Sequence, residues 1–166
     1  MSDGRVAICP GTYDPVTNGH LDIIGRAARV FDRVIVGVVN QPVRKQTTLF
    51  TADERRAFIE DAVTRNGVTN VEVTVFSNLL VEMAQQHGAG AIVKGLRAIS
   101  DFEYEFEMNQ LNRKLAPDIE SVYIIASPNY SFLSSTGVKE MATFGGDVSD
   151  LVPAGVAEAL AERLKR

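Results

Sequence analysis

Three segments of the 166-residue sequence combine glycine, hydroxyl and basic residues in a way that suits phosphate binding. In the first, residues 10–20, Gly11 lets backbone approach a ligand, Thr12 offers a hydroxyl, and His20 falls in the first turn of a predicted helix. Helix N-terminal N–H groups together with a histidine donor favour bound phosphate. A well-capped turn with a solvent-exposed histidine is the structural alternative.

The second segment places two cations around a glycine, directly after an apolar run. Lys94 and Arg97 flank Gly95, and cations in such a place can grip phosphate oxygens. Alternatively, they pair with Asp101 or Glu103 on the surface, where ion pairs are common.

The third segment, residues 127–139, is rich in serine and opens another predicted helix. Its hydroxyls, with Lys139 one turn into the helix, indicate a second anion-binding helix start. Ordinary N-capping by Ser134 or Ser135 is the alternative. Three such segments, each following a predicted strand, support one another.

Short β-branched runs alternate with amphipathic stretches along the chain. The runs predict strands at residues 6–9, 34–39, 71–76, 91–93 and 122–126. Helices are predicted at residues 21–31, 51–65, 79–87, 102–115, 135–144 and 154–165. Nearly continuous apolar strands are typical of parallel sheets covered on both faces. We therefore expect an α/β fold with a doubly wound five-stranded parallel sheet, in one domain spanning residues 1–166, that binds ligands at the carboxyl ends of its strands.

Several functions are disfavoured by what the sequence lacks. No G-x-x-x-x-G-K-[ST] loop, G-x-G-x-x-G fingerprint or G-x-S-x-G elbow occurs. Two histidines and the lone Cys9 cannot build a usual zinc site, and Cys9 is expected to be a buried thiol. The net charge of −4 gives no reason to expect a nucleic-acid partner. Residues 1–5 are polar and no apolar run could span a membrane, so we expect a cytoplasmic protein without a membrane partner.

The same segments resemble those of bacterial phosphopantetheine adenylyltransferases, a family of the nucleotidyltransferase superfamily, along nearly the whole chain. Residues 17–20 match the superfamily's T/H-x-G-H signature, and residues 130–136 match its serine-rich second signature. Residues 94–97 with 101–105 are characteristic of this family. The resemblance implies a Rossmann-like nucleotidyltransferase fold and transfer of the adenylyl group of ATP to 4'-phosphopantetheine, in coenzyme A biosynthesis. Tyr13 and Thr136 depart from the usual phenylalanine and serine.

The resemblance also implies site residues. His20 and Thr12 would contact the ATP phosphates and stabilise the transition state. The nucleotide pocket would comprise Thr12, Tyr13, His20, Gly95, Leu96, Arg97, Glu105, Tyr130, Ser131, Phe132, Leu133, Ser134, Ser135 and Thr136. The pantetheine side would comprise Thr12, Arg44, Lys45, Leu80 and Lys94. The resemblance further implies a homohexamer that uses magnesium, which we expect to arrive mainly bound to the ATP phosphates because the sequence shows no clustered carboxylate site for a metal ion.

The loop at residues 40–50 is about two residues longer than is common in the family, so the position of the family's loop lysine is open. An ungapped count places Arg44 there, and the other register places Lys45. We favour Lys45 as a catalytic cation, because a compact ammonium can follow a moving phosphate more easily than a planar guanidinium can. The alternative is that both cations are merely solvated.

Other functions stay open at this point. Another acceptor within the superfamily, such as nicotinamide mononucleotide or a phosphoalcohol taking CTP, is disfavoured by residues 94–97 and 102–105. A non-catalytic nucleotide-binding module is disfavoured by His20 and the two hydroxyl-rich segments. A tRNA-charging enzyme would need a further RNA-binding domain. No covalent enzyme intermediate is expected, since the acceptor's own phosphate is the nucleophile.

Overall fold

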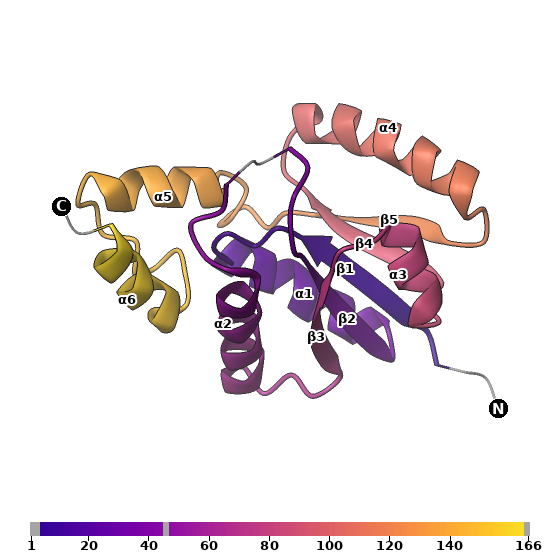
Figure 1. Cartoon of the computed structure of the whole chain (residues 1–166), viewed down its shortest axis with the longest axis horizontal. Helices are drawn as coiled ribbons and strands as arrows, with labels where there is room; N and C mark the ends of the chain where they lie inside the picture. The colour runs from indigo at the N-terminus through magenta and orange to yellow at the C-terminus, as the bar shows by residue number, and fades with distance from the viewer. Residues whose placement is uncertain (1–3, 45–46, 165–166) are drawn as a thin grey trace.

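A five-stranded parallel sheet forms the centre of the structure, a computed structural model that describes residues 4–44 and 47–164. The strands are β1 (Val6–Gly11), β2 (Arg33–Val39), β3 (Val71–Phe76), β4 (Ala91–Leu96) and β5 (Glu120–Ile125). Their order is β3-β2-β1-β4-β5, and every neighbouring pair is parallel (Figure 1). The chain winds in opposite directions on the two sides of β1 and β4, so the prediction of a doubly wound parallel sheet is confirmed.

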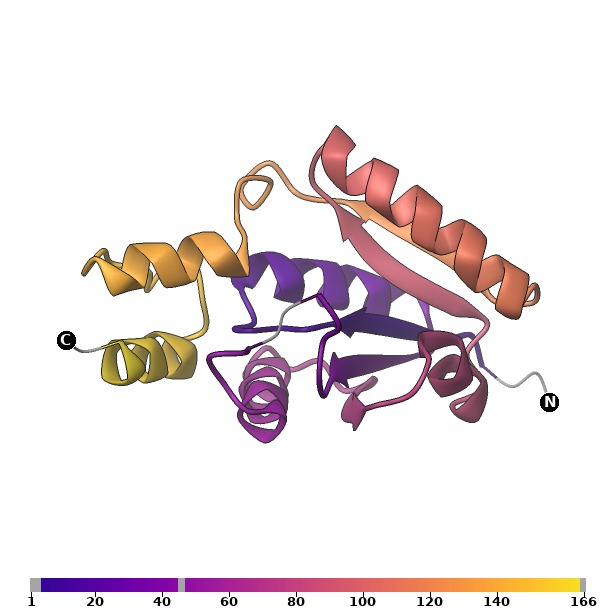
Figure 2. The ribbon, with the colours of Figure 1, turned by 45° about the horizontal axis from the view of Figure 1, so that its top comes forward.

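Helices cover both faces of the sheet. They are α1 (Asn18–Val30), α2 (Ala52–Arg65), α3 (Leu80–Gln86), α4 (Ile99–Leu115), α5 (Ser135–Thr143) and α6 (Ala154–Arg163). α1 and α2 pack on the face that carries Cys9 and Val36, whereas α3 packs on the opposite face against Ile8 and Ile35. α5 and α6 lie beyond the carboxyl ends of the strands (Figure 2). None of the helices in the two described ranges combines the length and apolar character needed to cross a membrane.

Capping boxes fix where two of the helices begin. Thr51 caps α2 and forms a capping box with Glu54. Thr17 caps α1 and forms a second capping box with His20, so α1 begins at residue 18 instead of the predicted 21. α4 also begins three residues early, at Ile99, and no side chain caps it, so the sequence offers no start signal there.

β1 and β4 both extend beyond their apolar runs. β1 continues to Gly11, and β4 continues through Lys94 to Leu96, paired with β5 along its whole length. Four residues of these extensions line a cavity instead of the apolar core, namely Pro10, Gly11, Lys94 and Gly95, which is why hydrophobicity alone did not predict them. Lys94 and Gly95, expected in a loop after the strand, therefore belong to the strand itself.

Candidate active site

A cavity of about 590 Å³ opens at the carboxyl ends of β1 and β4. β1 contributes residues 9–11 to its wall, and β4 contributes residues 93–95. These two neighbouring strands are where the winding reverses, and doubly wound folds bind ligands at that point. The volume lies within the range of small-molecule and cofactor sites.

Two helix N-termini meet at this cavity. α1 contributes its N-cap Thr17 and the first-turn residue His20, and α5 contributes its N-cap Ser134 and residues 135–136. The N-capping proposed as an alternative for Ser134 is present, since its Oγ accepts the Gly137 N–H at 3.0 Å. Both helix ends carry partial positive charge toward the cavity, and together they favour an anionic ligand such as a phosphate chain.

The turn that begins α1 holds His20 in one orientation. Its Nδ1 accepts the Thr17 backbone N–H at 3.0 Å, and Thr17 Oγ1 lies 3.0 Å from the same nitrogen. A neutral imidazole whose Nδ1 accepts a hydrogen bond carries its proton on Nε2. His20 therefore brings an Nε2–H donor to the cavity wall.

Two glycines allow the wall to close around this site. A Cβ on Gly11 would lie 2.9 Å from the Tyr13 ring, and one on Gly95 would lie 2.9 Å from Cγ1 of Ile23. Both distances are far shorter than carbon atoms tolerate, so larger residues would displace the Tyr13 ring or the α1 side chain.

The cations of the second segment are paired with acidic residues of α4. Arg97 Nε lies 3.1 Å from Asp101 Oδ2, as one sequence-based alternative predicts, whereas Lys94 Nζ lies 2.9 Å from Glu105 Oε2. All four side chains line the cavity and are partly exposed. The Arg97–Asp101 pair is the more exposed of the two, and exposed pairs contribute little stability, so a ligand phosphate can compete for Arg97.

Comparison with known proteins decides the family. A sequence model of the cytidylyltransferase-like family matches residues 8–141. The phosphopantetheine adenylyltransferase of Heliobacterium modesticaldum is 51% identical over 158 residues, which cover 95% of this chain and 92% of the relative. The phosphopantetheine adenylyltransferase of Alkaliphilus metalliredigens is 48% identical over 159 residues, which cover 96% of this chain and 99% of the relative. The chain belongs to the phosphopantetheine adenylyltransferases.

A solved structure of lower similarity shares the fold. A candidate nicotinate-nucleotide adenylyltransferase from Vibrio parahaemolyticus matches with a TM-score of 0.73 and 16% identity, over 98% of this chain and 96% of the other. At that identity the match concerns the fold alone. The sequence-based predictions of phosphopantetheine adenylyltransferase membership and of a nucleotidyltransferase fold are thus confirmed.

Tyr13, where the family usually has phenylalanine, supports His20 from the preceding loop. The two ring centroids are 5.1 Å apart in an edge-on arrangement. The Tyr13 hydroxyl donates to the Cys9 carbonyl oxygen at 2.9 Å, a bond that phenylalanine cannot make. Burial, with a smaller contribution from Cys9, raises the pKa of Tyr13 well above its usual value, so this donor stays protonated.

Most residues that the resemblance assigns to the nucleotide pocket line the cavity. These are Tyr13, His20, Gly95, Arg97, Glu105, Tyr130, Leu133, Ser134, Ser135 and Thr136. The other four do not line the cavity, although each is adjacent in sequence to a residue that does. They are Thr12, Leu96, Ser131 and Phe132. The Phe132 side chain is 70% exposed.

The residues assigned to the pantetheine side are less closely grouped. Lys94 lines the cavity. Leu80 begins α3 and packs with the apolar clusters on the face of the sheet that α3 covers, opposite α1 and α2. The Arg44 guanidinium lies over the Tyr104 ring, 4.1 Å from its centroid. Tyr104 lines the cavity, whereas Arg44 itself is not among the lining residues. Lys45 lies outside the described residues.

Sequence reasoning assigned one residue of α4, Glu105, to the pocket but missed its neighbours on the same helix. Ser100, Asp101 and Tyr104 also line the cavity. All four lie on one face of the helix, and this helical spacing could have indicated the other three. The predicted start at residue 102 left Ser100 and Asp101 outside the helix.

Lys139, predicted to strengthen the α5 anion site, turns away from the cavity. Its Nζ lies 2.9 Å from Oδ2 of the buried Asp14 and is not part of the described wall. The reason is electrostatic, since a carboxylate with no exposure to solvent requires a cation close by.

The cavity wall does not fit a metal ion held by the protein. In the described ranges, no group of three or more His, Cys, Asp or Glu side chains is arranged to hold one. The wall carboxylates Asp101 and Glu105 are each paired with a cation. That magnesium enters with ATP stays a prediction.

Cys9 is expected to be chemically inert in the folded protein, although it borders the cavity. Its side chain is 2% exposed, and burial raises the pKa of the thiol to about 12. Since only the thiolate is an efficient nucleophile, we expect native protein to react with a disulfide reagent at pH 8 far more slowly than protein in denaturant. Equal rates in the two conditions would contradict the burial of this thiol.

Proposed function

We propose that adenylyl transfer from ATP to 4'-phosphopantetheine takes place in this cavity, giving dephospho-coenzyme A and pyrophosphate. The observation that carries the proposal is the convergence of two helix N-termini and the His20 donor on one cavity at the point where the sheet's winding reverses. Family membership supplies the donor and acceptor.

The reaction needs positioning and charge stabilisation more than acid–base chemistry. A phosphate oxygen of the acceptor attacks the α-phosphorus of ATP, a new P–O bond forms, and the bond to the departing pyrophosphate breaks. We assign to His20 Nε2–H, with Thr12, the stabilisation of negative charge on the phosphoryl oxygens. Lys94 and Arg97 are proposed to bind pantetheine phosphate and nucleotide phosphate respectively, replacing their present carboxylate partners. Magnesium, bound to the ATP phosphates, would neutralise part of their charge.

A product assay tests this function directly. The protein is incubated with ATP, Mg²⁺ and 4'-phosphopantetheine, and dephospho-coenzyme A and pyrophosphate are measured. We expect both products in equal amounts, and a preference for ATP when CTP and GTP compete at equal concentration. Product only from nicotinamide mononucleotide, or comparable product from CTP, would assign a different acceptor or nucleotide. Nucleotide binding without any product would favour a binding module.

The loop after β2 is proposed to supply a further cation to the acceptor phosphate. Arg44 already has a partner in the Tyr104 ring, an arrangement that suits a planar guanidinium. We therefore expect Lys45→Ala to lower turnover with phosphopantetheine more than Arg44→Ala does, measured as kcat and KM. Arg44→Lys serves as a charge-retaining control. A larger loss from Arg44→Ala would assign the role to Arg44, and no loss from either would show that both cations are only solvated.

We also propose that the chain forms a homohexamer, in the cytoplasm, where ATP is available. α4 supports self-association because none of its 17 residues is buried. Ile99 is 82% exposed, and Phe102, Phe106, Leu111 and Leu115 are each at least 50% exposed. Large exposed apolar side chains gathered on one helix are typical of a surface covered by another subunit.

Sedimentation equilibrium at micromolar concentration checks the assembly. We expect a mass about six times 18.1 kDa for the wild type and a smaller species for Phe106→Glu, because a charge in place of this exposed apolar side chain of α4 opposes its burial. Val30→Glu is the matched control, since Val30 is similarly exposed but lies on α1. A monomeric wild type would overturn the proposal.

A further inference from the structure

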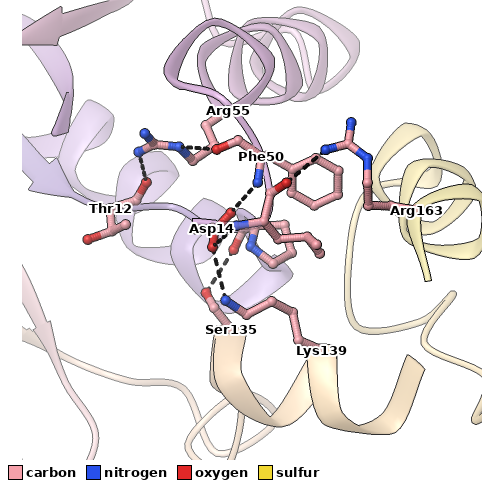
Figure 3. Close-up of polar contacts among 9 residues, drawn as sticks. Thr12, Asp14, Phe50, Arg55, Ser135, Lys139 and Arg163 are labelled. Carbon is pink, nitrogen blue, oxygen red and sulfur yellow. Dashed lines mark hydrogen bonds and ion pairs between the residues drawn. The ribbon is translucent and has the colours of Figure 1, made fainter. Parts of the chain in front are cut away.

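Asp14 is a fully buried carboxylate that lies outside the cavity wall, in the loop between Thr12 and α1, the helix whose first turn carries His20. Its Oδ1 accepts the Phe50 N–H at 2.9 Å, and its Oδ2 accepts the Leu49 N–H at 2.9 Å. Lys139 donates to the same Oδ2 at 2.9 Å (Figure 3). Three donors from two other parts of the chain therefore meet at one side chain.

Arg55 completes this arrangement from α2. It is 1% exposed, and its guanidinium donates to the carbonyl oxygens of Thr12 at 2.7 Å and Phe50 at 3.1 Å. It also donates to Val39 at 2.8 Å and Asn40 at 3.0 Å, at the end of β2. Phe50 thus has its N–H bonded to Asp14 and its carbonyl oxygen bonded to Arg55.

The residue between these two attachments has an unusual backbone. Tyr13 has φ of 52°, a conformation that L-residues with large side chains rarely adopt. Such a conformation persists only where the surroundings impose it. Here the carbonyl oxygen of Thr12 is held by Arg55, and Asp14 is held by its three donors, so Tyr13 is fixed from both sides.

The same contacts join the three segments that carry the proposed functional residues. The β1–α1 loop carries Thr12 and leads into the first turn of α1, which carries His20. The Leu49 and Phe50 amides end the loop that carries Arg44. The third segment is the start of α5, where Ser135 Oγ donates to the Pro15 carbonyl oxygen at 2.7 Å and Lys139 follows one turn later. The Asp14 carboxylate is their common point of attachment (Figure 3).

We propose that Asp14, with Lys139 as its partner, is a positioning residue for adenylyl transfer, holding Tyr13 and through it the His20 ring in place. The kinetic part of this inference rests on the proposed function, whereas its structural part does not. The carboxylate keeps its charge at neutral pH. Burial alone would raise its pKa, but the Leu49 and Phe50 amides and Lys139 outweigh that effect and lower it.

A rival interpretation follows from the sequence, in which Lys139 binds ATP phosphates directly. The two interpretations predict different kinetics. A positioning pair affects the geometry at the reacting phosphorus, so its loss lowers kcat and changes the KM for ATP little. A direct phosphate ligand contributes to ATP binding, so its loss raises that KM.

The first experiment is a double-mutant cycle of Asp14→Asn and Lys139→Gln. We expect Asp14→Asn to lower kcat about 100-fold, with the KM for ATP within about threefold of wild type. The double variant should lose little more than Asp14→Asn alone, because the second change removes a partner that is already lost. Additive losses, or a large rise in the KM for ATP on Lys139→Gln, would overturn the proposal. If Asp14→Asn does not fold, Lys139→Gln alone tests the proposal. A lower kcat with little change in the KM for ATP supports a positioning role, and a raised KM for ATP contradicts it.

Met83→Ala is the control for simple destabilisation. Met83 is 1% exposed on α3 and packs with Ile8 and Ile35, in an apolar cluster separate from the one that contains Tyr13 and Phe50. Below its melting temperature this variant should keep wild-type kcat. An equal kcat loss in Met83→Ala would show that Asp14 has only a general structural role.

A second experiment does not depend on catalytic activity and uses proton NMR. The chain has two histidines, His20 and His87, so the signals of their ring protons can be assigned with a His87→Gln variant. The nearby Tyr13 ring shifts the His20 signal. We expect Asp14→Asn to move that signal toward the value of an unstructured histidine and to leave the His87 signal unchanged. An unchanged His20 signal would refute the positioning role, whereas failure of the wild type to make dephospho-coenzyme A would refute only the proposed function.

Discussion

Replacing His20 with alanine is expected to reduce kcat about 100- to 1,000-fold, which corresponds to about 2.7–4 kcal/mol of lost transition-state stabilisation. The reason is the orientation of the ring. Its Nδ1 is occupied by the Thr17 N–H, so the donor at the cavity is Nε2–H. A donor that acts on developing charge contributes more to the transition state than to bound ATP, so the KM for ATP should change little. Steady-state kinetics with phosphopantetheine measure both effects.

Two control variants separate this role from the capping role of the same side chain. His20→Asn can place an amide oxygen near the Nδ1 position, where it would accept the Thr17 N–H, but it lacks the Nε2–H donor. We expect it to be as inactive as His20→Ala while retaining more of the helix-cap stability. His87→Ala, at the end of α3, should keep wild-type turnover. Near-normal turnover in His20→Asn would assign His20 a structural role only.

The strands were predictable because burial on both faces leaves a local signal. β1 and β2 send alternate side chains into separate apolar clusters, as Ile8 and Cys9 do, so the runs are continuous. Where a strand end faces the cavity, as at Lys94, that signal stops before the strand does. The carboxyl ends of β1 and β4 were therefore placed too early by hydrophobicity alone.

The three phosphate-suited segments were predictable because their residue types and their positions after strands are both local properties. The contacts that arrange them were not. Asp14 bonds to residues 35, 36 and 125 positions away, and Arg55 reaches Thr12 across 43 positions. The sequence does contain one indication that Arg55 is buried, because its spacing places it on the same face of α2 as Ile59 and Ala62. A cation on an apolar helix face requires buried partners, although the sequence does not say which.

Arg55 should accordingly contribute far more to stability than its neighbour on the same helix. We expect Arg55→Met to lower the free energy of unfolding by about 3–5 kcal/mol, because methionine keeps the aliphatic packing but removes the guanidinium. Four carbonyl oxygens would then lose their donor. Burial lowers the pKa of Arg55 and the nearby Asp14 carboxylate raises it, so the variant also removes charge balance from a buried anion. Denaturant unfolding followed by circular dichroism measures the loss.

Arg56→Met is the matched comparison, since it makes the same substitution one residue further along α2. Arg56 lies near Asp53 and Glu60 at the surface, at 3.6 Å and 3.7 Å, and the Asp53 side chain is 84% exposed. Exposed pairs of this kind are worth about 0–1 kcal/mol, so Arg56→Met should cost no more than that. The difference between the two variants therefore isolates the buried guanidinium. Equal losses would mean that the carbonyl oxygens around Arg55 find other donors, and that this residue does not hold the loops of the site together.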